Sequence, residues 1–247
     1  MKADPFVQAR LLQLQALDTR LQQIGHARAR LPQFAALEEA NLQLQRAADN
    51  VVRAETSLSD VRREVTRAET DVQQVRDRAT RDQSRLDAGT GMTSRDLTAL
   101  QSELESLARR QSALEDVEIE AMERQEAAEA RVAASTGEQQ KWQAEVDRLV
   151  SERDAALADL DAERAEVAAP REQMVASIDD ALITLYDRIR ENSGGLAAAE
   201  LKHGRCGGCR LELNPTDLAA IDKAAVDEVV RCEECSRILV RIPDSQS

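Results

Sequence analysis

Residues 37–86 read LEEANLQLQRAADNVVRAETSLSDVRREVTRAETDVQQVRDRATRDQSRL, and apolar side chains recur in them every seven residues. One series holds Leu, Val or Ala at positions 37, 44, 51, 58, 65, 72, 79 and 86. A second series, three residues later, holds Ala or Val from Ala40 to Val75 and breaks at Asp82. This alternation of three- and four-residue steps is typical of a coiled-coil seam. The sequence therefore predicts one long helix whose apolar face packs against a partner helix.

The segment DAGTGMTSRD, residues 87–96, interrupts the repeat. Gly89 and Gly91 are suited to end a helix, because glycine adopts the left-handed conformation of a helix C-cap. Thr93, followed three residues later by Asp96, resembles a capping box and indicates the start of a new helix. A short connection between two heptad helices predicts an antiparallel hairpin with its turn near residues 88–93.

The second helix of the predicted hairpin carries its own seam between residues 97 and 167. Leu or Val recurs at positions 97, 104, 132, 146, 160 and 167, but Gln111, Glu118 and Gln125 occupy seam positions in between. Polar seam residues weaken a coiled coil but can fix its register. Pairing position 86 with position 97 places Leu37 opposite Val146. Because the first helix is near neutral and the second acidic, Arg side chains of the first can also meet carboxylates of the second.

Prolines mark both ends of the predicted hairpin. The apolar residues at positions 14–24 are out of phase with the series that begins at Leu37, so we expect Gly25 and Pro32 to break or kink the first helix. We expect Pro170 likewise to break or kink the second helix, with a new amphipathic helix from Met174 onwards. The segments 6–31 and 171–190 should pack together at the base.

The four cysteines form two Cys-x-x-Cys pairs with 22 residues between them: Cys206 with Cys209, and Cys232 with Cys235. Two such pairs can supply four thiolates to one tetrahedral zinc ion. Four protein ligands leave no open position for water, so the predicted site is structural. The alternatives are a redox dithiol and a disulfide. The first needs a thioredoxin-like α/β setting, and cytosolic reduction disfavours the second.

The residues around the cysteines predict a small ribbon with short strands. Alternating side chains at 210–213 (RLEL) and 237–242 (RILVRI) indicate strands after each pair. Between them, residues 214–224 (NPTDLAAIDKA) predict a short helix capped by Asn214, with Pro215 at its first position. His203 is an alternative zinc ligand, but with four thiolates available we expect it to be a surface histidine.

The overall composition excludes several classes of protein. Only four of the 247 residues are aromatic, which limits the size of any core, and residues 91–195 carry 12 basic and 24 acidic residues, a net charge of −12. Such a segment repels a phosphate backbone. No signal-like or membrane-spanning run is visible, so we expect a cytoplasmic protein without membrane attachment. No nucleophile motif or phosphate-binding loop accompanies the two histidines, so we expect neither enzyme activity nor a small-molecule substrate.

Taken together, these features resemble the bacterial zinc-ribbon coiled-coil hairpin family, long of unknown function. CGGC at 206–209 and CEECSRIL at 232–239 are similar to its ribbon, and LQSELESLARRQSALED at 100–116 is similar to its actinobacterial branch. The resemblance implies a mostly α fold. Residues 1–195 would form a long antiparallel coiled-coil hairpin with kinked base helices, and residues 196–247 a ribbon whose four cysteines bind one structural Zn²⁺. Members of this family resemble adaptors or regulators of flagellar and secretion systems, and nucleic-acid binding has also been proposed for them. The resemblance therefore implies one of these roles for this chain.

Two functions follow as expectations. The first is a non-enzymatic adaptor or regulatory protein that binds other proteins, which the acidic hairpin favours. The alternative is a regulator that binds RNA or DNA through the ribbon. Either partner would be contacted by basic residues of the ribbon, for which the candidates are Lys202, Arg205, Arg210, Arg231, Arg237 and Arg241.

Overall fold

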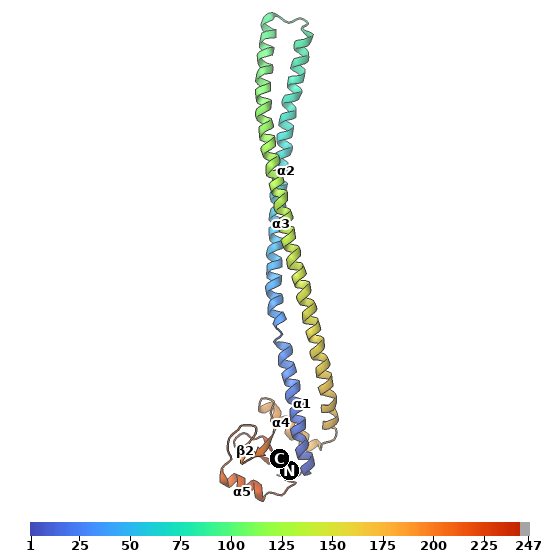
Figure 1. Cartoon of the computed structure of the whole chain (residues 1–247), viewed down its shortest axis with the longest axis vertical. Coiled ribbons are helices and arrows are strands. Elements are labelled where there is room, and N and C mark those ends of the chain that lie inside the picture. The colour runs from blue at the N-terminus through green and yellow to red at the C-terminus, as the bar shows by residue number, and fades with distance from the viewer. Residues whose placement is uncertain (243–247) are drawn as a thin grey trace. The chain divides into compact units, whose positions relative to one another are not determined.

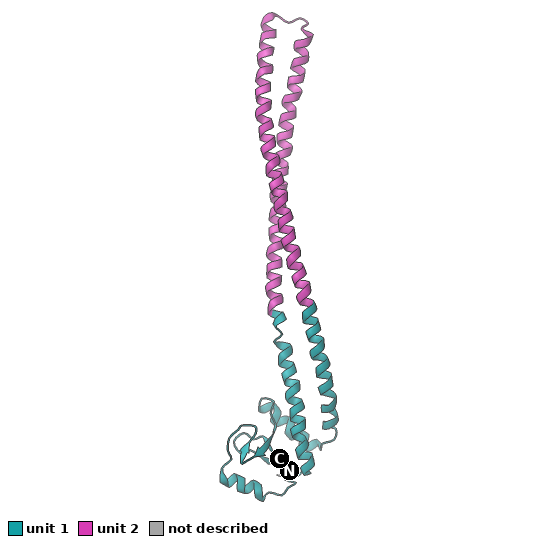
Figure 2. Ribbon diagram, in the orientation of Figure 1, with its two compact units in different colours: residues 1–34, 151–247 teal, residues 35–150 magenta. Residues whose placement is uncertain are grey.

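The computed structural model describes residues 1–242, which are mostly helical (Figure 1). The helices are α1 (Pro5–Ala29), α2 (Pro32–Ala88), α3 (Ser94–Val175), α4 (Asp180–Asn192) and α5 (Pro215–Lys223). The strands are β1 (Ala198–Lys202), β2 (Arg205–Cys206), β3 (Val230–Arg231) and β4 (Ile238–Arg241). The chain divides into two compact units, residues 1–34 with 151–247 (unit 1) and residues 35–150 (unit 2), coloured separately in Figure 2.

Unit 2 is the predicted antiparallel hairpin, formed by α2 and α3 side by side (Figure 2). Its seam contains the heptad positions: Leu58, Val65, Val72 and Val75 of α2 are buried, as is Leu107 of α3. One apolar cluster joins residues 37 and 40 of α2 to residues 146 and 149 of α3, which confirms the predicted register. The heptad pattern therefore predicted both the two helices and the register in which they pair.

The turn of the hairpin also forms as predicted. α2 ends at Ala88, and Gly89 and Gly91 adopt φ angles of +57° and +78°, which favour glycine. At the start of α3, the Thr93 backbone N–H donates to the Asp96 carboxylate at 3.0 Å, and the Asp96 N–H donates to the Thr93 hydroxyl at 3.3 Å. These reciprocal bonds satisfy donors that the helix itself leaves free, and they lower the pKa of Asp96.

Ion pairs cross the hairpin, mainly from arginines of α2 to carboxylates of α3, although a solvated face is the simpler expectation for these charges. In unit 2, Arg62 pairs with Glu129 at 3.0 Å and Arg76 with Glu115 at 2.6 Å. All four side chains are at least one-third exposed, so each pair stabilises the fold by less than about 1 kcal/mol. The pairs reinforce the register, while the apolar seam supplies most of the stability.

Only one of the predicted proline breaks occurs at the proline. The first helix does break between Ala29 and Pro32, but α1 continues through Gly25, which is exposed and meets no obstruction. Of the two alternatives at Pro170, the break does not occur: α3 continues to Val175 with Pro170 inside it. The break follows at residues 176–179, where the Asp179 carboxylate accepts from the Ala181 N–H and caps α4.

The base of unit 1 is an apolar core shared by α1, α4 and the sheet, which confirms that the two terminal helical segments pack together. Its fully buried members include Leu11 and Leu14 of α1, Leu182 and Tyr186 of α4, and Ile238 of β4. The first residues of the chain also join this unit, because the N–H of residue 3 donates to the carbonyl of residue 227 at 2.7 Å.

Polar side chains are buried among these apolar ones. The side-chain oxygen of Gln15 accepts from the Ala197 N–H at 2.6 Å, and the side-chain NH₂ group of Gln15 donates to the Gly195 carbonyl at 2.8 Å. Asp18 accepts from the Tyr186 hydroxyl at 2.8 Å. Burial and this carboxylate strongly raise the pKa of Tyr186. The network ties α1 to α4 and to the chain entering β1.

The sheet of unit 1 has the strand order β2-β1-β4-β3, with β1 parallel to β4 and the outer pairs antiparallel. The predicted strand at 237–242 is confirmed as β4. The predicted strand at 210–213 is wrong, since this segment forms only an isolated bridge between Glu212 and Arg205. The central partner of β4 is instead the alanine-rich β1, which the sequence did not indicate. The predicted helix is confirmed as α5, where the Asn214 side chain accepts from the Asp217 N–H at 2.9 Å.

Candidate metal centre

The two Cys-x-x-Cys pairs meet at one point of unit 1. The four sulfur atoms lie within 4.8 Å of one another, with Cys206 Sγ 3.8 Å from Cys235 Sγ and Cys209 Sγ 3.9 Å from Cys232 Sγ. A tetrahedral zinc ion with Zn–S bonds of about 2.3 Å requires sulfurs about 3.8 Å apart. All four cysteines are free thiols, and none forms a disulfide. The cluster therefore fits one zinc ion with no further ligand.

The two Cys-x-x-Cys pairs lie in two separate backbone turns of the same conformation. The Arg210 N–H donates to the Cys206 carbonyl at 2.8 Å, and the Ser236 N–H donates to the Cys232 carbonyl at 2.8 Å. Arg210 and Ser236, which follow the second cysteine of each pair, both have φ of +63°. The two turns thus present their sulfurs in the same way, as two halves of a closed site.

The glycines of the first turn permit a close approach of the backbone. The Gly207 N–H donates to the Glu200 carbonyl of β1 at 2.9 Å, and a Cβ at Gly207 would lie 3.0 Å from that oxygen. The Gly208 N–H points at Cys206 Sγ at 3.4 Å. These contacts hold the first turn against β1 and orient a donor toward one sulfur.

The thiols differ in acidity before a metal binds. Burial raises the pKa of Cys206, and it raises the pKa of Cys232 to about 12. Burial also opposes ionisation of Cys235, but hydrogen bonds from the backbone and side chain of Arg237 outweigh it and lower the pKa to about 7. A zinc ion, when bound, supplies the positive charge that keeps all four sulfurs ionised, so binding releases protons.

The metal cluster lies on one face of the sheet and the helical core on the other. Ala199 of β1 and Leu239 of β4 pack with Cys206 and Cys232, whereas neighbouring residues of the same strands belong to the helical core. Leu213 and the α5 residue Ile221 complete the cluster on the metal side. The parallel β1–β4 pair is therefore a shared layer between the zinc site and α1 and α4.

Most of the basic residues expected to contact a partner bind carbonyl or carboxylate oxygens of this chain. Arg241 donates to five backbone carbonyls of residues 221–228, and Arg237 donates to the carbonyls of Ser193 and Leu196 at 3.0 and 2.8 Å. Arg231 donates to the Ser236 carbonyl at 2.9 Å, and Arg205 pairs with Glu212 at 3.4 Å. The sequence did not reveal that Arg237 and Arg241 hold backbone turns in place.

Two of the six candidates remain available to a partner. The side chains of Lys202 and Arg210 are exposed and have no hydrogen-bond or ion-pair partner among residues 1–242. His203 forms the turn between β1 and β2 with φ of +49°, is exposed, and lies outside the cluster of ligand atoms.

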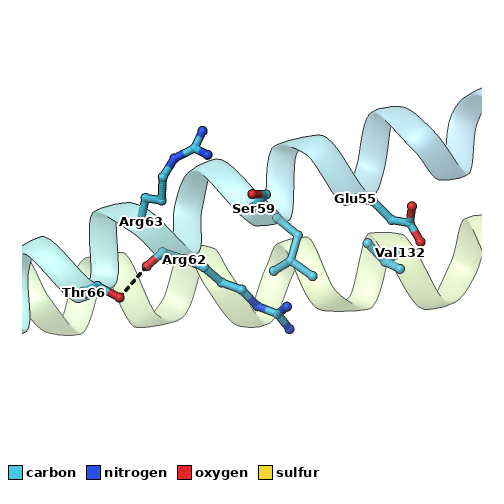
Figure 3. A pocket seen from close by; sticks show the side chains of 7 residues that line it. Glu55, Ser59, Arg62, Arg63, Thr66 and Val132 are labelled. Carbon is cyan, nitrogen blue, oxygen red and sulfur yellow. Dashed lines mark hydrogen bonds between the residues drawn. The ribbon is translucent and has the colours of Figure 1, made fainter.

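A second concentration of arginines lines a hollow in unit 2 (Figure 3). Val132 of α3 lies beneath it, and Arg62 and Arg63 of α2 flank it. Arg62 pairs with Glu129, and Arg63 pairs with Asp60 of its own helix. Both guanidinium groups are thus already neutralised, which gives this hollow little attraction for an anion.

The hairpin and the cysteine cluster each match a known family of domains. Residues 14–194 match the CT398-like coiled coil hairpin domain, and residues 205–239 match the C4-type zinc ribbon domain. The chain belongs to the CT398-like family. Its ribbon therefore contains one structural zinc site formed by the four cysteines.

The relatives extend this similarity along the whole chain. An uncharacterized protein of Mycobacterium tuberculosis strain H37Rv is 38% identical over 242 residues, 98% of each chain. A solved structure from Mycobacterium smegmatis is 36% identical with a TM-score of 0.82, covering 98% of this chain and all of the other. CT398 from Chlamydia trachomatis shares the fold at 18% identity, with a TM-score of 0.62 over 96% of this chain and 98% of its own. The mycobacterial relatives agree with the resemblance of the sequence to the actinobacterial branch of the family.

Proposed function

We propose that this protein is a non-enzymatic adaptor or regulator that binds other proteins through its helical hairpin, while the zinc ribbon stabilises the base. The observation that carries this proposal is the use of the ribbon's basic residues. Four of the six candidates bind oxygens of this chain, and only Lys202 and Arg210 are left for a phosphate backbone.

The charge of the hairpin supports the same choice. Residues 91–195 carry the net charge of −12, and the exposed arginine concentration at Arg62 and Arg63 is neutralised by carboxylates. A nucleic acid binds proteins chiefly through cations that neutralise its phosphates. Protein binding requires no such cations and suits long exposed helices, which present side chains at regular spacing.

The test is affinity purification of the tagged full chain from its native host, with and without nuclease. Protein partners that are recovered reproducibly after nuclease treatment support the adaptor. A salt-dependent mobility shift with RNA or DNA, abolished by Arg205→Ala with Arg210→Ala, would instead establish the nucleic-acid function. Glu212→Gln, which removes the carboxylate that pairs with Arg205, is the control because it leaves both cations in place. Absence of a reproducible protein partner would refute the proposal.

A further inference from the structure

The exposed surface of α3 between residues 115 and 126 differs from the rest of the hairpin. Ile119 and Met122 expose 55% and 49% of their surface and lie about 60° apart around the helix, whereas Val117, 47% exposed, lies about 160° from Ile119 on another side. In unit 2 only Leu42 and Val52 are comparably exposed. Single exposed apolar residues are ordinary on a protein surface, but a cluster of them indicates an interaction site.

Folding of the hairpin does not explain these side chains. The seam of this part of α3 consists of Leu114, Ala121 and their neighbours, and Ala121 is almost fully buried. At 100° per residue, Ile119 lies about 130° from the centre of the seam, on the side of the helix that faces solvent. A β-branched residue is also less favourable in a helix than Ala. Ile119 thus adds nothing to the hairpin that Ala would not provide better.

Unpaired carboxylates surround the exposed apolar residues. Residues 115–126 contain six acidic residues and one basic residue, Arg124, which pairs with Glu64 of α2 at 2.9 Å. Glu115 pairs with Arg76. The other five acidic residues form no ion pair with any residue in the described range 1–242; they are Asp116, Glu118, Glu120, Glu123 and Glu126.

The arrangement of these residues matches one helix laid along another. Asp116, Ile119, Glu123 and Glu126 follow the i, i+3, i+7, i+10 spacing of a single helical stripe, and Met122 lies beside Ile119 on the face nearer the seam. The stripe presents an apolar centre with carboxylates on both sides. A complementary helix would carry apolar residues at the same spacing, flanked by Lys or Arg.

We propose that this α3 surface, residues 116–126, is the docking site for a basic amphipathic helix of a partner protein. The inference rests on the proposed adaptor function and names the surface and the chemistry of the partner. Charge complementarity selects this occupant, because the three unpaired carboxylates of the stripe, Asp116, Glu123 and Glu126, attract Lys and Arg at close range and repel a phosphate backbone or an anionic membrane. A second copy docked through the same face would set like charges against each other.

Site-specific photocrosslinking in the native host tests the proposal. The full chain carries p-benzoylphenylalanine at Ile119 and, as a matched control, at Val52, an exposed apolar residue of α2 that is 61% exposed. Crosslinked peptides are identified by mass spectrometry. We expect peptides of net positive charge with apolar residues at helical spacing from position 119, at least tenfold above position 52. Crosslinks to this chain itself, to nucleic acid, to acidic peptides, or equally from both positions would overturn the proposal.

Surface variants separate this inference from the adaptor function. Ile119→Gln with Met122→Gln should reduce recovery of the crosslinked partner at least tenfold, whereas Val52→Gln should leave it unchanged. Circular dichroism establishes that the variants retain their helices. If wild type and the double variant recover the same partners equally, the docking site is refuted while the adaptor stands. If wild type recovers no partner, the proposed function itself fails.

Discussion

Gln15 offers the sharpest test of how the helical base is joined to the sheet. Its side-chain oxygen accepts from the Ala197 N–H at 2.6 Å and the Ala198 N–H at 3.3 Å, and its amide group donates to the Gly195 carbonyl at 2.8 Å. Gln15→Leu keeps a side chain of similar size in a buried position. It leaves the two N–H groups and the carbonyl without their side-chain partner.

The magnitude follows from the bonds lost. A buried donor left unsatisfied costs about 1–3 kcal/mol, and the 3.3 Å bond is the weaker of the two. We expect Gln15→Leu to lower the free energy of opening of unit 1 by about 3 kcal/mol, which is roughly a hundredfold loss of protection from exchange at 1.4 kcal/mol per tenfold. Gln8→Leu should cost less, because Gln8 only donates to the carbonyls of Ala3 and Val226.

Hydrogen exchange with mass spectrometry is the suitable assay, because it reports each unit separately. Peptides that cover α4 and β1 should lose protection in Gln15→Leu, whereas peptides from residues 37–146 of unit 2 should not change. Gln13→Leu is the matched control, since Gln13 is exposed on the same helix and its side chain forms no hydrogen bond within residues 1–242. Equal protection in the Gln15 and Gln13 variants would refute the role assigned to the buried amide.

Four further outcomes are expected. Chelation of zinc from the protein with intact cysteines should unfold the ribbon, seen as lost exchange protection at β1–β4; retained protection would contradict it. Zinc affinity, measured by chelator competition, should fall as the pH decreases from 8 to 6, because Cys206 and Cys232, with their raised pKa values, must lose protons to bind; a flat profile would contradict it. Gly195→Ala should lower the urea midpoint of unit 1, because Gly195 has φ of +96° and an added Cβ would lie 2.2 Å from the Gln22 side-chain oxygen. An unchanged midpoint would contradict both the backbone strain and the clash with Gln22. Asp82→Leu should stabilise the hairpin by about 1 kcal/mol and raise its thermal midpoint, because it replaces a buried seam carboxylate with an apolar side chain. A lower thermal midpoint by circular dichroism would show that the ion pairs of Asp82 with Arg78 and Arg85 contribute more than an apolar side chain.

The features that the sequence predicted well are those with a local or periodic cause. Heptad spacing predicted the register of Leu37 against Val146, and the Thr93–Asp96 pair predicted the start of α3. The paired Cys-x-x-Cys motifs predicted the metal cluster because a structural zinc ion needs four ligands in one place, and the two pairs supply four thiolates. Each of these signals is carried by residue types whose roles change little with tertiary context.

The errors have a common physical origin in tertiary contacts. β1 begins with two alanines, which have low strand propensity, and it forms because these small side chains fit between the helical core and the metal cluster. Pro170 does not end α3, and the break occurs where the Asp179 side chain caps the next helix. Arg237 and Arg241 resembled partner contacts, but carbonyl groups distant in sequence bind them. None of these causes is visible from neighbouring residues alone.

The alternation of side chains along β1 explains why a structural metal can matter to the helices. Ala198 faces the core formed with α1 and α4, and the next residue, Ala199, packs with the metal-binding cysteines. Arg237 adds a second link, because its guanidinium lies near Cys235 and donates to the carbonyl of Ser193 just after α4. Loss of the metal would therefore free both the strand and the arginine that hold the end of α4. The ribbon thus stabilises the helical base of unit 1, with which it shares the β1–β4 layer.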